Sequence, residues 1–138
     1  MLLTEGLENV YARHYRLAEG VRQAVAAWGM KPCAQSRDVY SDTVTAVVVP
    51  DGFNGTDVVA VAAEKYGVPF GVGLGEVAGK VFRIGHLGSL TDVMALSGLA
   101  TAEMAMADLG FPIKLGSGLA AAQEYYRNSA GETQRKAA

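Results

Sequence analysis

The chain has 138 residues, of which 50% are hydrophobic and 19% are charged, and its formal net charge is −2 at pH 7. This composition excludes an intrinsically disordered segment, and the length favours one compact domain that buries a core without disulfide bonds or metal ions. Because the basic residues are scattered and acidic residues outnumber them, the chain lacks the positive field that nucleic-acid binding needs, and no nucleic-acid partner is expected.

The first predicted element is a long amphipathic helix. Apolar residues recur at steps of three or four from Leu3 to Trp28, and charged residues occupy the face between them. Gly29 is the expected stop. His14 falls on the apolar stripe, which favours a buried, hydrogen-bonded histidine over a ligand. A helix of about eight turns is longer than one face of a small sheet needs, and it is a first indication of another domain.

A buried strand and a second helix follow. Residues 45–49 form a β-branched run of the kind found in strands. The pattern then predicts a helix over residues 56–66, with Asn54 or Thr56 as its N-cap and Gly67 as its stop.

Two further strands are expected before the next helix. Residues 68–72 are a weak candidate because Pro69 cannot donate a backbone hydrogen bond. The glycine-rich residues 73–79 predict a flexible or sharply turned loop. Residues 80–84 alternate strictly between the two faces and predict a strand.

The remaining elements are two helices and a tail. Ser89 and Asp92 have the spacing of a capping box, and apolar residues repeat at helical steps behind them over residues 93–107. A short last helix is predicted over residues 117–126, with Ser117 as its cap. From Ser129 onward the residues are small and polar, as expected of a frayed end.

Two glycine clusters deserve comparison with phosphate-binding loops. The sequence Gly71-x-Gly73-x-Gly75 is followed by a strand and not by the helix that dinucleotide binding requires, which favours a plain connection between strands. Gly116-Ser117-Gly118 does precede a helix, where an anion could bind, but the lysine of a P-loop is missing.

Other common sites are not expected. With one cysteine, Cys33, no intramolecular disulfide can form. Cys33, His14 and His86 lack the spacing of zinc ligands, so no metal is predicted, and the Gly-x-Ser-x-Gly motif of serine hydrolases is absent. The chain starts without the basic region of a signal peptide and has no run of about 20 apolar residues. These features predict a cytoplasmic protein without a membrane partner.

Arg83 is the most informative side chain. In an alternating strand Phe82 and Ile84 share one face, while Val81, Arg83 and Gly85 share the other. An arginine in the middle of a strand is costly unless its guanidinium finds an anion, and its planar fork suits a carboxylate in two-point contact. The alternative is an exposed arginine or one paired with an Asp or Glu of the chain.

His86 lies in the turn after this strand. A loop residue on a rigid support favours a functional role more than a core residue does. The sequence leaves this role and a purely structural one equally open.

Residues 73–88, Gly-Leu-Gly-Glu-Val-Ala-Gly-Lys-Val-Phe-Arg-Ile-Gly-His-Leu-Gly, resemble the C-terminal region of class V aminotransferases of fold type I. The similarity is greatest to the serine-glyoxylate aminotransferases and reaches to about Asn128. It includes Glu5-Gly6-Leu7-Glu8-Asn9-Val10 with Arg13-His14, the sequence Asn54-Gly55-Thr56-Asp57, and the helix predicted after Leu90.

The resemblance implies an α/β (α+β) fold in which a long N-terminal helix leads into a small, mostly antiparallel sheet covered on one face by helices. The expected divisions are residues 1–30 for the helix, 31–128 for the small domain and 129–138 for a flexible tail.

The implied activity is transfer of an amino group from serine, or in related enzymes alanine, to glyoxylate by pyridoxal phosphate (PLP), which for serine gives hydroxypyruvate and glycine. In the family the cofactor and its lysine belong to a large N-terminal domain that this chain does not contain. Five lysines lie outside the family's lysine motif: Lys31, Lys65, Lys80, Lys114 and Lys136. The chain alone is therefore expected to be inactive and to hold no catalytic residue.

Arg83 matches the family arginine that binds the substrate α-carboxylate. Gly73, Gly75, Gly85 and His86 are expected neighbours of that pocket. The implied partners are the large domain, a second copy in a homodimer, and small amino and oxo acids.

Two other hypotheses remain at this point. The order of strands and helices also suits a free-standing ferredoxin-like module that senses a small carboxylate. Alternatively, the chain is a structural interaction domain in which Arg83 forms only a salt bridge.

Overall fold

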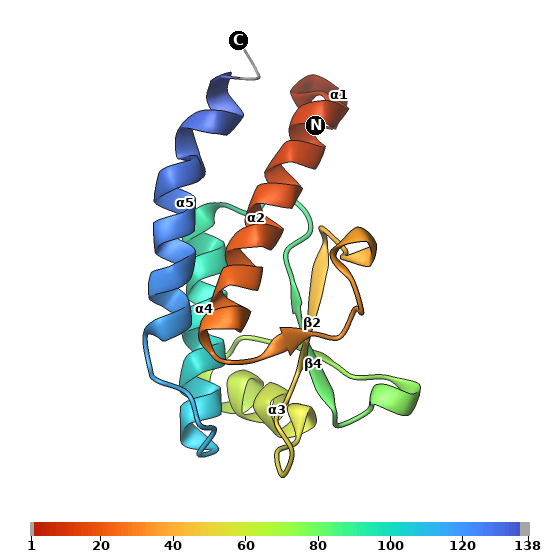
Figure 1. The fold of residues 1–138 in the computed structure, drawn as a ribbon, viewed down its shortest axis with the longest axis vertical. Helices are drawn as coiled ribbons and strands as arrows, with labels where there is room; N and C mark the ends of the chain where they lie inside the picture. Colours follow the sequence, from red (N-terminus) through yellow and green to blue (C-terminus); the bar gives the residue numbers. More distant parts are fainter. Residues whose placement is uncertain (1, 136–138) are drawn as a thin grey trace.

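The computed structural model describes residues 2–135 and the side chains of residues 3–130. Its larger elements are three helices on one side of a small sheet and a fourth at the end of that sheet (Figure 1). In chain order the elements are α1 (Leu2–Glu5), α2 (Leu7–Ala27), β1 (Lys31–Pro32), the 3₁₀ turn η1 (Arg37–Val39), β2 (Val44–Val48), α3 (Gly55–Tyr66), β3 (Gly71–Val72), the 3₁₀ turn η2 (Gly75–Val77), β4 (Val81–Gly85), α4 (Asp92–Asp108) and α5 (Ser117–Arg135).

The predicted N-terminal helix is confirmed, with one interruption. Gly6 has a φ of 84° and separates the short α1 from α2. The apolar stripe of α2 is buried, and the helix packs lengthwise against α5 (Figure 1). After Trp28 the chain leaves the helix at Gly29, whose φ of 73° is the left-handed conformation expected of a helix stop.

The four strands form one antiparallel sheet in the order β1-β2-β4-β3. The predicted strands at residues 45–49 and 80–84 correspond to β2 and β4, each shifted by one residue. The weak candidate shrinks to the two residues of β3, because Pro69 lacks the amide that a longer strand would use. Strand β1 was missed because two residues, one of them a proline, give no alternating pattern.

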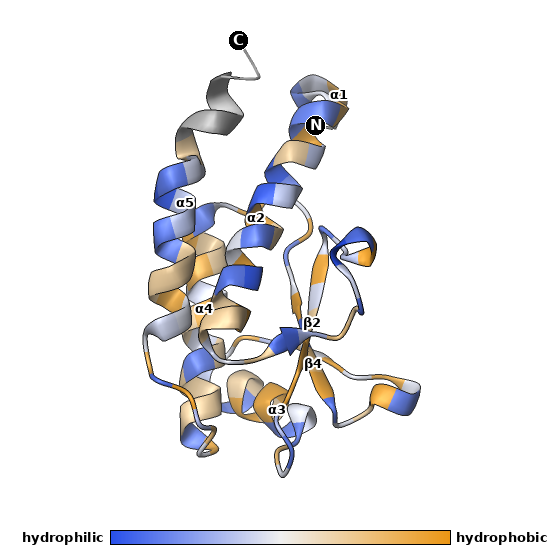
Figure 2. Cartoon of the chain, in the orientation of Figure 1, coloured by the Kyte–Doolittle hydropathy of each residue, from blue (hydrophilic) through white to orange (hydrophobic). Residues whose placement is uncertain are grey.

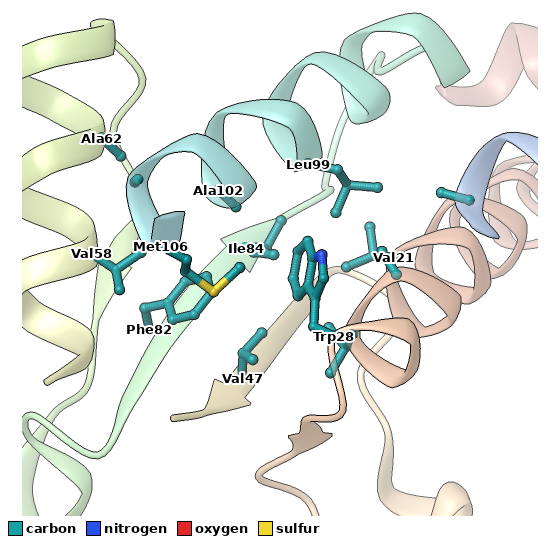
Figure 3. Close-up of a cluster of buried hydrophobic side chains, with 14 of the residues drawn as sticks. Val21, Trp28, Val47, Val58, Ala62, Phe82, Ile84, Leu99, Ala102 and Met106 are labelled. Carbon is teal, nitrogen blue, oxygen red and sulfur yellow. The ribbon is translucent and has the colours of Figure 1, made fainter. Parts of the chain in front are cut away.

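The two faces of the sheet differ. Val47 pairs with Phe82 and Thr45 with Ile84, and these side chains are buried beneath the helices. Figure 3 shows Val47, Phe82 and Ile84 among side chains of α2, α3 and α4, and Figure 2 shows the apolar residues of β2 and β4. On the opposite side the described residues place loops and the short 3₁₀ turns η1 and η2, and none of the α-helices (Figure 1).

The core lies between the helices and the inner face of the sheet. Its largest fully buried apolar side chains include Phe82, Leu17, Leu99 and Met106, and Trp28 fills the space beside α5. Burying such side chains stabilises the fold by about 1.5 to 3 kcal/mol each. The predicted fold class is confirmed.

The helix caps differ in part from the prediction. Asn54 caps α3, because its Oδ1 accepts a hydrogen bond from the amide of Thr56 at 2.8 Å. For α4 the predicted capping box at Ser89 is wrong: Thr91 is the N-cap, and its hydroxyl accepts from the amide of Met94 at 3.3 Å. Thr91 is the residue directly before the helix, where a side-chain oxygen reaches the free amides.

Helix α5 is longer than predicted and is not capped by Ser117. It extends to Arg135, so residues 129–135 of the expected tail lie in the helix, whereas residues 136–138 lie outside the described residues. The hydroxyl of Ser117 is buried without a hydrogen-bond partner. None of the described helices is long and apolar enough to cross a membrane.

The N-terminus of α5 is instead closed by Glu103 of α4. This carboxylate is 2% exposed. It accepts hydrogen bonds from the amides of Gly116 at 2.6 Å, Gly118 at 2.7 Å and Leu119 at 3.1 Å, and from the Trp28 indole at 2.8 Å. The position at the Gly116-Ser117-Gly118 sequence where an anion could bind is therefore occupied by a carboxylate of the chain itself, and the free amides of the helix are satisfied.

Candidate functional site: the guanidinium of Arg83 on the open face of the sheet

The structure places Arg83 on the face of β4 that the helices leave open. It pairs with Ala46 of β2 on one side and with Gly71 of β3 on the other. Directly paired residues of an antiparallel sheet project to the same face, and both of these partners are small. Arg83 is half-buried, so part of this residue is accessible to solvent.

The Arg83 guanidinium is held by the backbone. Its Nε donates to the carbonyl oxygen of Val72 at 2.9 Å. Among the side chains that the structure describes, no carboxylate forms an ion pair with it, although Arg13, Arg16, Arg22 and Arg37 all have one. The salt-bridge hypothesis therefore fails within residues 3–130, and the terminal nitrogens Nη1 and Nη2 remain available to an anion.

The predicted neighbour glycines lie in different settings. Gly85 is exposed on the same strand and the same face as Arg83. Gly73 lies under η2, where a Cβ would be 2.2 Å from the Val77 carbonyl oxygen. Gly75 starts η2 with a φ of 55°, and its surroundings are open. Gly71, which directly faces Arg83, was not among the predicted neighbours, because only the register of β3 against β4 reveals it.

His86 is not beside Arg83. Continuing the alternation of β4 turns it to the inner face, where it is 1% exposed. Its Nδ1 donates to the Asp42 carbonyl oxygen at 3.0 Å, and in the neutral ring its Nε2 accepts from the Thr45 hydroxyl at 2.9 Å. His86 and Gly85 both line a groove of about 690 Å³ on the helix side, but Arg83 is not among its lining residues.

Burial lowers the pKa of His86 from 6.5 to about 4, and the charge of Arg22 acts in the same direction. In the unfolded chain this histidine takes up its proton near pH 6.5, whereas in the folded chain it does so only near pH 4. Stability is therefore retained above pH 6.5 and lost as the pH falls towards 4, with a loss of about 2 kcal/mol between pH 7 and pH 5.

Urea unfolding at pH 7 and pH 5 tests this expectation when wild type is compared with His86→Asn. The variant lacks the titrating ring, so its loss between the two pH values should be smaller by about 2 kcal/mol. Equal losses in both proteins would contradict it.

His14 is also structural, as predicted from its place on the apolar stripe. Its Nδ1 donates to the Val10 carbonyl oxygen at 2.7 Å and its Nε2 accepts from the Gly88 amide at 3.0 Å. Arg13 donates to the Gly88 carbonyl oxygen at 2.6 Å, so α2 holds the loop after β4 through both backbone groups of one residue. The described residues contain no group of three or more His, Cys, Asp or Glu side chains that could hold a metal ion.

No protein-family model matches the chain. Over 99% of its length it is 65% identical to the L-aspartate-glyoxylate aminotransferase of Paracoccus denitrificans, and over 94% it is 54% identical to the serine-glyoxylate aminotransferase of Hyphomicrobium methylovorum. Its structure matches the pyridoxamine-pyruvate aminotransferase of Mesorhizobium loti with a TM-score of 0.85 and 37% identity, covering 92% of this chain and 33% of that one.

The chain therefore has an α/β fold that matches the small domains of aminotransferases. It is similar to aminotransferases, two of which are named for glyoxylate and one for pyruvate. The chain spans about a third of the length of these curated relatives, 35% of the first and 32% of the second.

Proposed function

We propose that this chain is the substrate-carboxylate-binding domain of a PLP-dependent aminotransferase that transfers an amino group from serine to glyoxylate. The observation that carries the proposal is Arg83, which lies on the open face of the sheet without a carboxylate partner among residues 3–130. Both substrates carry a carboxylate next to the reacting carbon, and a guanidinium binds such a group in two-point contact. The similarity to aminotransferases over nearly the whole chain favours this function over a free-standing carboxylate sensor.

The relatives differ in the amino donor for which they are named, so more than one donor is a candidate for this enzyme. The Paracoccus relative is named for L-aspartate, and the Hyphomicrobium relative is named for serine. Both donors carry the α-carboxylate that Arg83 would bind, so this residue serves either one. L-Aspartate is therefore the second candidate, and alanine is the third.

The chain's own residues fit the substrate carboxylate and not the cofactor. A PLP phosphate is commonly held by a helix N-terminus. At α5 that position is filled by Glu103, at α3 by the Asn54 side chain, and at α4 by the Thr91 hydroxyl. Lys65 is paired with Asp108 at 2.7 Å. We therefore assign PLP binding, and the lysine that it needs, to the two-thirds of the enzyme that corresponds to the rest of the relatives.

In the mechanism this chain binds and orients the substrate. Arg83 fixes the carboxylate, so the substrate's α-carbon can turn only about one axis, and the bond to be broken takes a defined direction. Bound PLP supplies the electron sink for the reaction at that carbon. The open sheet face would lie towards the large domain, in a cytoplasmic homodimer.

The native gene product tests this function. Its denatured mass in source cells, detected with an antibody against this chain, should be several times the 14.4 kDa of the chain. The purified product should convert glyoxylate to glycine only when both PLP and serine are present, with L-aspartate and alanine as comparison donors. A product of 14.4 kDa that binds carboxylates without PLP would instead support the sensor hypothesis.

A further inference from the structure

We propose that Gly71 is a positioning residue for Arg83, and that Gly71 and the Val72 carbonyl together restrict the guanidinium to end-on binding of a carboxylate through Nη1 and Nη2. This inference rests on the proposed function of Arg83 and specifies how its side chain is aimed.

The first observation is the space above Gly71. A Cβ at this position would lie 2.9 Å from Nε, 3.1 Å from Cβ and 3.3 Å from Cζ of Arg83. These distances are too short for an undisturbed contact, so the arginine side chain passes directly over the glycine. The backbone of Gly71 does not have a positive φ, so its conformation is open to any residue. The absence of a side chain at residue 71 therefore makes room for the Arg83 side chain and is not required by the backbone conformation.

The second observation is the hydrogen bond from Nε. A guanidinium offers a carboxylate two edges: the side edge, with Nε and one Nη, and the end, with Nη1 and Nη2. In this structure Nε already donates to Val72 at 2.9 Å, which blocks the side edge. The end of the fork, with Nη1 and Nη2, is the edge that remains for a carboxylate.

Together, Gly71 and Val72 set the orientation of the Arg83 guanidinium. Gly71 lets the stem lie flat across the edge strand, and Val72 fixes the rotation of the guanidinium plane. A methyl group at residue 71 would lift the stem, break the bond to Val72 and change the angle at which the carboxylate is held. Because a tilted guanidinium no longer meets the carboxylate in two-point contact, such a change should weaken substrate binding.

The first test compares Gly71→Ala with Gly98→Ala in the native enzyme. Gly98 lies in α4, and a Cβ there would meet nothing within 4 Å, so its variant controls for the same chemical change. Gly71→Ala should raise KM for glyoxylate and for serine roughly tenfold with a smaller effect on kcat, whereas Gly98→Ala should leave both constants unchanged. In an Arg83→Ala background Gly71→Ala should have no further effect, since its action passes through Arg83.

The outcomes separate this inference from the proposed function. If Arg83→Ala leaves kcat/KM unchanged, the proposed function fails. If Arg83→Ala is impaired and Gly71→Ala behaves like Gly98→Ala, the proposed function stands and the positioning role of Gly71 fails. An equal loss from Gly71→Ala with and without Arg83 would also overturn the positioning role.

A second test uses the wild-type protein and so does not depend on the folding of a variant. Propionate is added while the side-chain nitrogens of Arg83 are followed by ¹H–¹⁵N NMR. End-on binding should move the Nη resonances and leave the Nε–H resonance nearly in place, because that hydrogen stays bonded to Val72. A shift of Nε–H as large as those of the Nη groups would overturn end-on binding.

Discussion

Replacing Glu103 with alanine should lower the free energy of unfolding by about 4 kcal/mol, a large fraction of the stability of a domain this size. The change removes the acceptor of four hydrogen bonds: two from amides of α5, one from the amide of Gly116 just before it, and one from Trp28. Each buried donor left without a partner costs about 1 to 3 kcal/mol, and the favourable interaction of the negative charge with the helix N-terminus is lost as well. The same substitution leaves a cavity between α2, α4 and α5.

Glutamine at residue 103 should be less harmful. Oε1 accepts three of the four bonds, so an amide oxygen in its place satisfies Trp28, Gly118 and Leu119. Its amide nitrogen would face the Gly116 amide, donor against donor. We therefore expect a loss of roughly 2 kcal/mol for Glu103→Gln.

Urea unfolding measures both variants. Trp28 is the only tryptophan of the chain and donates directly to Glu103, so its fluorescence reports this contact. The matched control is Glu124→Ala on the exposed surface of α5, which should change stability by no more than about 0.5 kcal/mol. A Glu103→Ala loss below about 1 kcal/mol would show that water or a rearranged loop replaces the carboxylate.

Much of the framework could be predicted from the sequence because it depends on local patterns. The helical spacing placed α2, α3 and α4, and the alternation around Arg83 placed this residue on the face opposite Phe82. The same alternation, continued by two residues, would have placed His86 on the inner face. Its position after the last strand residue concealed that signal.

The remaining features depend on contacts between distant residues. That Gly71 lies opposite Arg83 follows from the register of β3 and β4, which no local pattern specifies. That Glu103 caps α5 follows from the packing of α4, 13 residues before the first amide it binds. In both cases the sequence shows a glycine and a charged residue, and only the fold shows that they are partners.

Replacing Arg83 with alanine in the native enzyme should lower kcat/KM for both glyoxylate and serine by roughly 30- to 150-fold, which corresponds to about 2 to 3 kcal/mol for a charge-assisted pair. Both substrates should be affected because each presents a carboxylate to the same guanidinium. Arg83→Lys should also be impaired, because an ammonium group can neither form the two-point contact nor keep the Nε bond to Val72.

Two comparisons show whether the fall in kcat/KM of Arg83→Ala results from lost binding of the substrate carboxylate. Arg127→Ala removes an exposed arginine of α5 and should leave kcat/KM near that of wild type. Ethanolamine is serine without its carboxylate, so wild type and Arg83→Ala should act on it at equal, low rates. If kcat/KM for serine stays within twofold of wild type in Arg83→Ala, or if the variant loses as much with ethanolamine as with serine, Arg83 does not bind the substrate carboxylate.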